Sequence, residues 1–272
     1  MEYENFDCEI REGCARLALI GPGDPALGTL CDEFTDLMLR LQEDRAARVI
    51  LLIDGDHSFD FHTQLDSLTD ARDQGRGFDL VAAEDEVVRR MVTMIHEIDK
   101  PVVAATRGDI RDAGLGLYLA ADIRLASTQA TFTTADLCSG LLPGWGLLHT
   151  LPRLIGPGRT LDFLWSGRTF GAEEAARIGL VDRLVGEQTW DQEIDDYCQR
   201  LRDIPQPAVR LTKLGAQQSS SLDLTTMLSY EWESQQQCWD SAETTEGLRA
   251  LREMRPPELG AHDDPTDDDQ ED

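Results

Sequence analysis

Hydrophobic and polar positions follow two different periods along the first fifty residues. Residues 5–20 hold two strand-like stretches separated by the turn sequence at 11–13, which predicts a β-hairpin. Between residues 27 and 41 the large apolar side chains recur every three or four positions, as on one face of an amphipathic helix. The run 48–53 is mostly apolar, which is typical of a strand buried on both faces. Hairpin, helix and buried strand in this order predict an α/β layer structure.

The rest of the chain predicts further elements of both kinds. A polar stretch at 55–82, which carries Gly75 and Gly77, predicts a long loop, and long loops in compact domains are commonly functional. The elements expected after it are a helix at about 84–98, buried strands at 101–106 and 123–126, mostly helical structure beyond residue 145, and a final helical section at about 208–254.

Two changes in composition divide the chain into three regions. Pro205 and Pro207 interrupt the helical pattern and indicate a joint. We therefore expect a core at 1–204 and a C-terminal helical region at 205–255. The acidic tail at 256–272 lacks the apolar residues needed to bury a core and is expected to be disordered.

Acidic residues outnumber basic ones by about two to one in this chain of 272 residues. Lys and Arg total 25 against 52 Asp and Glu, and the formal net charge is −27. Such a charge argues against a nucleic-acid or anionic-membrane binder, since either needs basic patches. Molar salt screens most of the self-repulsion, so a halophilic host explains the acidity, and an acidic mesophilic protein is the alternative.

Two further absences in the sequence bear on its location. No stretch approaches the roughly 20 continuous apolar residues that a membrane-spanning helix needs. The acidic N-terminal sequence also lacks the basic and apolar segments of a signal peptide. We expect a cytoplasmic protein.

The six cysteines are scattered and form no metal-binding pattern. They include no C-x-x-C pair and no histidine at ligand spacing, so no metal site is expected. Cys8 and Cys14 flank the predicted turn, and a hairpin would let them approach one another. Reduced thiols are the expectation for a cytosolic chain.

The middle of the chain carries several motifs in a fixed order. The motifs are KPVVAA at 100–105 with Gly108, ADIRLAS at 121–127, ATF at 130–132, GLLPG at 140–144, LPRLIG at 151–156 and SGRTFGAEEAARIGLV at 166–181. Several collinear motifs are far more specific than one short pattern. In content, order and spacing they resemble the enoyl-CoA hydratase/isomerase (crotonase) family.

The resemblance implies an α/β fold and a substrate class. The family fold is a spiral of β-β-α units followed by a C-terminal helical trimerisation region. Its members act on acyl-CoA thioesters, so coenzyme A enters as part of the substrate and no separate cofactor is expected. The resemblance also implies a homotrimer or a dimer of trimers.

In the family, two backbone N–H groups hold the thioester oxygen as it takes on enolate charge. Donors of this kind are worth about 2.7–4 kcal/mol each. By resemblance, one donor here is the N–H of Leu65, within Phe61–Asp66, and the other is the N–H of Ala113. Gln64 and Ala113 stand where the family usually has glycine, whose conformational freedom the backbone path can require.

The family's hydratases, which are lyases, use a pair of glutamates, and this chain departs from that pattern. The first glutamate position is Gly116, which cannot transfer a proton, and the second is Asp136. Hydration needs one group to activate water and another to deliver a proton. A single carboxylate resembles the family's isomerases instead. For a proton shuttle near neutral pH, burial would have to raise the pKa of Asp136 from about 3.9.

Each remaining candidate has a functional and a structural interpretation. Asp136 is a proton-transfer group or a helix N-cap. His62 is a second acid/base group or an exposed loop residue, and Trp145 is a wall of the acyl pocket or part of the core. Lys213 contacts the CoA phosphates or is a solvated surface charge, and His149 is expected to pack on a helix face.

Three hypotheses follow from these residues. The first is an enzyme that stabilises a thioester enolate, with Asp136 transferring the proton, and that is closer to an isomerase than to a hydratase. The second is a CoA-independent β-diketone hydrolase of the 6-oxocamphor hydrolase type, with His62 or His149 beside Asp136 as its acid/base set. The third is a non-catalytic binding or assembly member of the family.

Overall fold

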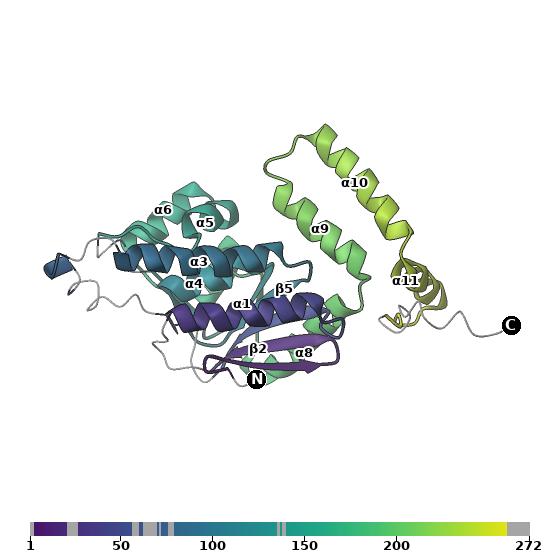
Figure 1. The fold of residues 1–272 in the computed structure, drawn as a ribbon, viewed down its shortest axis with the longest axis horizontal. Helices are drawn as coiled ribbons and strands as arrows, with labels where there is room; N and C mark the ends of the chain where they lie inside the picture. Colours follow the sequence, from purple (N-terminus) through teal and green to yellow (C-terminus); the bar gives the residue numbers. More distant parts are fainter. Residues whose placement is uncertain are drawn as a thin grey trace.

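The computed structural model describes residues 3–20, 27–55, 60–61, 70, 72–75, 79–134, 137 and 140–259. These residues form two β-sheets with helices around them (Figure 1). The larger sheet has six strands, and all neighbours except the first two pair in parallel. In spatial order its strands are β1 (Phe6–Arg11), β2 (Cys14–Leu19), β3 (Val49–Asp54), β5 (Val102–Thr106), β7 (Ile123–Ser127) and β10 (Arg183–Val185).

The smaller sheet is built from very short strands. They are β4 (Asp60–Phe61), β6 (Asp109–Arg111), β8 (Thr131–Thr133) and β9 (Phe170–Gly171). Strands of two or three residues are too short to show a hydrophobic period, so the sequence pattern did not predict them.

From β3 to β8, successive strands alternate between the two sheets, and this alternation gives the expected β-β-α spiral. The order β3, β4 and α3 (Asp79–Glu97) is followed by β5, β6 and α4 (Asp112–Ala120), and then by β7 and β8. The β-β-α spiral predicted from the resemblance is therefore confirmed.

The larger sheet is buried on both faces because its central strands are apolar on both sides. Ile50, Leu52 and Val102 lie in a core cluster with side chains of α1 (Leu27–Glu43), α3 and α4. Leu51, Ile53 and Val103 point to the opposite face and pack with α8 (Trp190–Arg202). The continuously apolar runs in the sequence therefore correspond to central strands, as predicted.

Besides α8, seven helical segments follow β8 in the described part of the chain. They are α5 (Leu147–Ile155), α6 (Pro157–Ser166), α7 (Ala172–Ile178), the short 3₁₀ turn η2 (Glu187–Thr189) and a C-terminal group of three helices, α9 (Gln206–Gln218), α10 (Leu224–Trp239) and α11 (Ala242–Glu253). In Figure 1, α9 and α10 pack side by side, and α10 lies farther from the sheets than α9. Most of the acidic tail lies outside the described residues.

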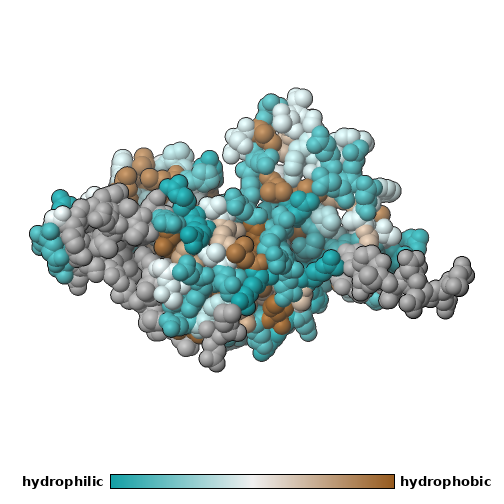
Figure 2. All heavy atoms as spheres, viewed as in Figure 1, coloured by the Kyte–Doolittle hydropathy of each residue, from teal (hydrophilic) through white to brown (hydrophobic). Residues whose placement is uncertain are grey.

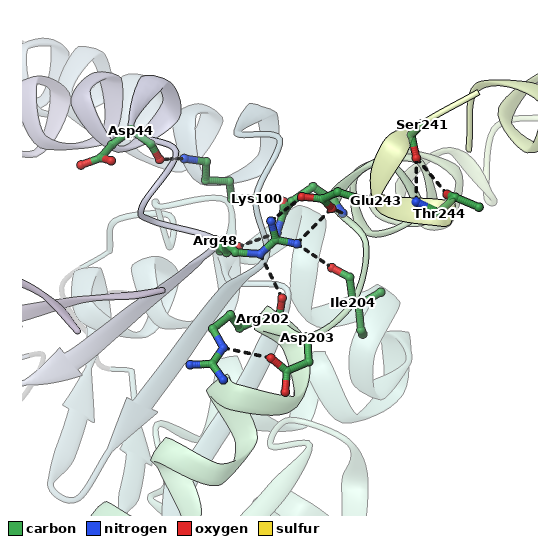
Figure 3. Close-up of polar contacts among 10 residues, drawn as sticks. Asp44, Arg48, Lys100, Arg202, Asp203, Ile204, Ser241, Glu243 and Thr244 are labelled. Atoms are coloured by element: carbon green, nitrogen blue, oxygen red, sulfur yellow. Dashed lines mark hydrogen bonds and ion pairs between the residues drawn. The ribbon is translucent and has the colours of Figure 1, made fainter. Parts of the chain in front are cut away.

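One buried arginine joins the C-terminal helices to the core (Figure 3). The Arg48 guanidinium donates two hydrogen bonds to the Glu243 carboxylate, at 2.5 and 3.0 Å, and two more to the backbone oxygens of Arg202 and Ile204. The Gln206 N–H also donates to Glu243, at 2.6 Å. Because Arg48 directly precedes β3, this cluster connects the first turns of α9 and α11 to the central sheet.

Replacing Glu243 with alanine should destabilise the whole protein. The substitution leaves the Arg48 charge buried without its carboxylate, which costs roughly 3–5 kcal/mol in comparable pairs. We expect this loss in urea unfolding followed by tryptophan fluorescence. The matched control is Glu174→Ala, which removes the carboxylate partner of Arg168 at the surface and should change the stability little.

The pH dependence of the Glu243 contribution has a defined sign. Burial opposes ionisation of Glu243, but hydrogen bonds from Arg48 and Gln206 outweigh it and lower the pKa of the carboxyl. The stability difference between the native protein and Glu243→Ala should therefore be full above about pH 4.3, the usual unfolded value. It should shrink as the pH falls through the lower folded pKa, and a difference that is independent of pH would contradict this assignment.

Candidate active site

The buried helix α4 contains Ala113, one of the two expected backbone donors. Every residue of α4 after Asp112 is buried, as befits a helix that is apolar on all sides. The N–H groups in the first turn of a helix have no partner within that helix, and the helix dipole favours negative charge there. Ala113 lies in this first turn. This position suits an N–H that receives an oxyanion, and the donor role of Ala113 stays a prediction.

The backbone at the start of α4 shows which residue needs conformational freedom. Asp112 has a φ of +39°, in the left-handed region that favours glycine and that aspartate tolerates better than most residues. Ala113 has no such strain among the residues described. The conformational freedom that glycine was expected to provide near Ala113 is therefore needed at Asp112.

Gly116, the position of the family's first glutamate, is closed to side chains by its surroundings. A Cβ atom added to Gly116 would lie 2.1 Å from the Cβ of Trp145 and 2.6 Å from the Trp145 backbone oxygen. Trp145 is itself 4% exposed and has a φ of +52°, two residues before the start of α5. The tryptophan thus occupies the space that a side chain at position 116 would need.

Trp145 belongs to the core cluster that surrounds α4. The structure therefore shows Trp145 as part of the core, which was one of the two interpretations of this residue. A contact of its indole with the acyl group stays a prediction.

Asp54 is a site residue that the sequence analysis missed. It ends β3, and its Oδ2 accepts hydrogen bonds from the Thr106 hydroxyl at 2.9 Å and from the N–H groups of Arg107 and Gly108 at 2.6 and 3.1 Å. Its other oxygen, Oδ1, is buried with no hydrogen-bond partner. Burial raises the pKa of the carboxyl against these hydrogen bonds.

The Asp54 carboxyl fixes the turn that leads from β5 through β6 to the donor helix α4. The available signal was an aspartate placed between a buried strand and Gly55. A Cβ at Gly55 would lie 2.1 Å from the Leu19 backbone oxygen, so glycine is needed at this close approach.

Lys213 is buried and holds other parts of the protein together, whereas one of its two expected roles was an exposed surface charge. Its ammonium group contacts Asp122 at 2.8 Å and donates to the backbone oxygens of Ile95 and Lys100 at 3.0 and 3.1 Å. These three contacts use its three N–H donors, and the side chain is 7% exposed. The solvated-charge interpretation is wrong, and a CoA phosphate would have to displace one of these internal partners.

Several expected site residues cannot be placed relative to α4. Asp136, His62, Leu65 and Gln64 lie outside the described residues, and their roles stay predictions. His149 is exposed on α5, which does not match its expected packing role.

The described residues contain no group of His, Cys, Asp and Glu side chains that could hold a metal ion. None of the helices described is long and apolar enough to cross a membrane.

The contact between Gly116 and Trp145 can be tested by adding a single methyl group. We expect Gly116→Ala to lower the free energy of unfolding by about 1–3 kcal/mol, because the new Cβ overlaps a buried side chain and its backbone. The control is Gly158→Ala in α6, where a Cβ meets nothing within 4 Å and alanine should be neutral or stabilising. Equal stabilities of the two variants in urea unfolding would refute the close contact.

Comparisons with known proteins agree with the fold and with the sequence motifs. The profile of the enoyl-CoA hydratase/isomerase family matches residues 22–262. Crotonyl-CoA hydratase of Syntrophomonas wolfei is 30% identical over 266 residues, which cover 94% of this chain and 97% of that protein.

Solved structures give the same result. An enoyl-CoA hydratase/isomerase from Cupriavidus metallidurans superposes with a TM-score of 0.82 at 28% identity, covering 94% of this chain and 96% of that one. An enoyl-CoA hydratase from Bacillus anthracis, 24% identical with a TM-score of 0.82, covers 93% of this chain and 98% of that one and shows the same fold. The match over nearly the whole chain, the sequence motifs and the β-β-α spiral lead to one conclusion: the protein belongs to the enoyl-CoA hydratase/isomerase family of enzymes.

Proposed function

We propose that this enzyme isomerises an enoyl-CoA thioester with a single carboxylate, Asp136, as the proton-transfer group. The observation that carries the proposal is the exclusion of any side chain at Gly116 by Trp145. Hydration needs two acid/base groups, whereas moving a double bond needs one group that takes a proton from one carbon and returns it to another. The absence of the first carboxylate therefore favours isomerisation over hydration.

In the proposed reaction, Asp136 removes a proton from the carbon between the thioester carbonyl and a β,γ double bond. The electrons spread onto the thioester oxygen, which accepts hydrogen bonds from the N–H groups of Ala113 and Leu65. Protonated Asp136 then returns its proton to the far end of the dienolate. The product is the conjugated enoyl-CoA, and no water is consumed.

The exposed apolar side chains of the C-terminal helices support self-association of the enzyme. The most exposed are Leu224 at 74%, Trp232 and Trp239 at 67%, and Leu251 at 76%. Figure 2 shows apolar residues among polar ones on this part of the surface. We propose that further copies of the chain cover this face, in a homotrimer or a dimer of trimers.

The role of Asp136 is tested by removing its charge while keeping its shape. Asp136→Asn should lower kcat for the isomerisation of a β,γ-enoyl-CoA by about 10²–10⁴-fold, because the amide cannot accept the substrate proton. A coupled assay that follows the conjugated product measures this loss. Asp162→Asn, which alters only a surface ion pair with Arg168, should keep the native rate.

Unchanged turnover by Asp136→Asn would contradict the proposal. Turnover of a cyclic β-diketone without CoA would instead favour the C–C hydrolase. If the native protein turns over neither substrate, the non-catalytic alternative is favoured.

Binding of a CoA thioester should raise the melting temperature of the protein. At a ligand concentration of about 100 Kd the expected stabilisation is about 2.7 kcal/mol, which corresponds to roughly 5–10 °C for a domain of this size. The shift should be larger in molar KCl than in dilute buffer, because salt screens the repulsion between the CoA phosphates and a chain of net charge −27. The absence of a shift at both salt concentrations would count against a CoA site.

A further inference from the structure

Two cysteines that are far apart in the sequence meet at the face of the large sheet covered by α8. Cys14 begins β2 and pairs in register with Val49 of β3, and Cys198 lies in α8. Because α8 packs across this face, the two cysteines belong to one packed cluster and line the same surface hollow. Both cysteines are free thiols in the structure.

The pair differs from the one that the sequence suggested. The hairpin places Cys8 opposite Leu17 and Cys14 opposite Arg11, so Cys8 and Cys14 are not cross-strand partners. The partner of Cys14 comes from a helix 184 positions later, which no local pattern indicates.

A small reagent can reach the pair from solvent. Both cysteines line a surface hollow of about 410 Å³ between the β1–β2 hairpin and α8. Cys198 is buried at 2% exposure, whereas Cys14 is only partly buried. Cys14 is therefore the thiol that an incoming molecule meets first.

The charges around the hollow give the two thiols different roles. The neighbouring Cys198 thiol lowers the pKa of Cys14 against the effect of burial, and Arg16 and Arg202 contribute in the same direction while Asp195 opposes them. The neighbouring Cys14 thiol and burial raise the pKa of Cys198. Cys14 is thus the better thiolate, and Cys198 keeps its proton until a later step.

Arg202 is held in place beside the pair. Its Nε contacts Asp203 at 3.0 Å, and its Nη1 donates to the Glu12 backbone oxygen at 2.7 Å. The positive charge that favours the Cys14 thiolate is therefore fixed by the surrounding protein and does not depend on a mobile side chain.

We propose that Cys14 and Cys198 form a dithiol site that small disulfides oxidise to an intramolecular disulfide between β2 and α8. The Cys14 thiolate attacks one sulfur of the small disulfide, whose S–S bond breaks and releases one thiolate. The Cys198 sulfur, losing its proton to that thiolate, then attacks Cys14 in the mixed disulfide and displaces the second thiolate, which takes a proton from water. The two cysteines are oxidised, and the small disulfide is reduced to two thiols.

The site lies at the opposite end of the sheet from the candidate active site. Cys14 neighbours Val49 at the start of β3, whereas Asp54 and the donor helix follow the ends of β3 and β5. The new bond would close a very long loop, and such closure restricts the unfolded chain. Oxidation should therefore change stability and leave catalysis unaffected.

The experiment uses the reduced full-length protein and 2-hydroxyethyl disulfide, a neutral reagent that the acidic surface does not repel. Intact mass should fall by two hydrogens without a retained adduct, and peptide mapping should join Cys14 to Cys198. The melting temperature should rise by roughly 5–10 °C and return to its starting value with dithiothreitol.

Single variants separate the two steps. Cys198→Ala should stop at a mixed disulfide on Cys14, because no second thiol resolves it, and Cys14→Ser should not form the bond. Cys8→Ser, in the same hairpin, is the matched control and should behave as the native protein does. The proposal is overturned if native protein keeps the adduct, if it does not react, or if mapping joins another pair of cysteines.

Discussion

The contact between Trp145 and Gly116 constrains the chemistry of this protein more than any other interaction described. It requires glycine at position 116 of the buried helix α4, because a Cβ there would overlap both the side chain and the backbone of the tryptophan. The same helix presents the Ala113 N–H in its first turn. The proposed oxyanion donor and the closed position of one family glutamate therefore lie on the same helix. A single-carboxylate reaction is consistent with both features.

Buried ion pairs and hydrogen-bonded cations hold the surrounding framework together despite a net charge of −27. The two lysines of the chain are both used internally. Lys100 donates to the backbone oxygens of Leu41 and Asp44 at the end of α1, and Lys213 contacts Asp122 and two further backbone oxygens. Their retention in an arginine-rich chain reflects these compact internal positions, where an ammonium group fits several converging oxygens. Arg48 has the equivalent role for the C-terminal helices, with a bidentate contact that suits a guanidinium.

The sequence predicted the long elements well because each has a clear period. The buried strands β3 and β5 and the amphipathic helix α1 fall close to their expected bounds. The strands of the smaller sheet were missed because two or three residues cannot show a period. At the site, the loss of the first carboxylate was visible from the family motif, but its cause was not. The close packing of Trp145 against Gly116, like the approach of Cys198 to Cys14, depends on tertiary contacts between residues distant in the sequence.

The central claim is that this family member moves a double bond and does not add water across it. The most direct measurement is NMR of the products formed when the enzyme is given a β,γ-enoyl-CoA in molar KCl. A single-carboxylate site predicts that conjugated enoyl-CoA accumulates while 3-hydroxyacyl-CoA forms far more slowly. Formation of 3-hydroxyacyl-CoA at a comparable rate would show that a second acid/base group is present, and it would contradict the account.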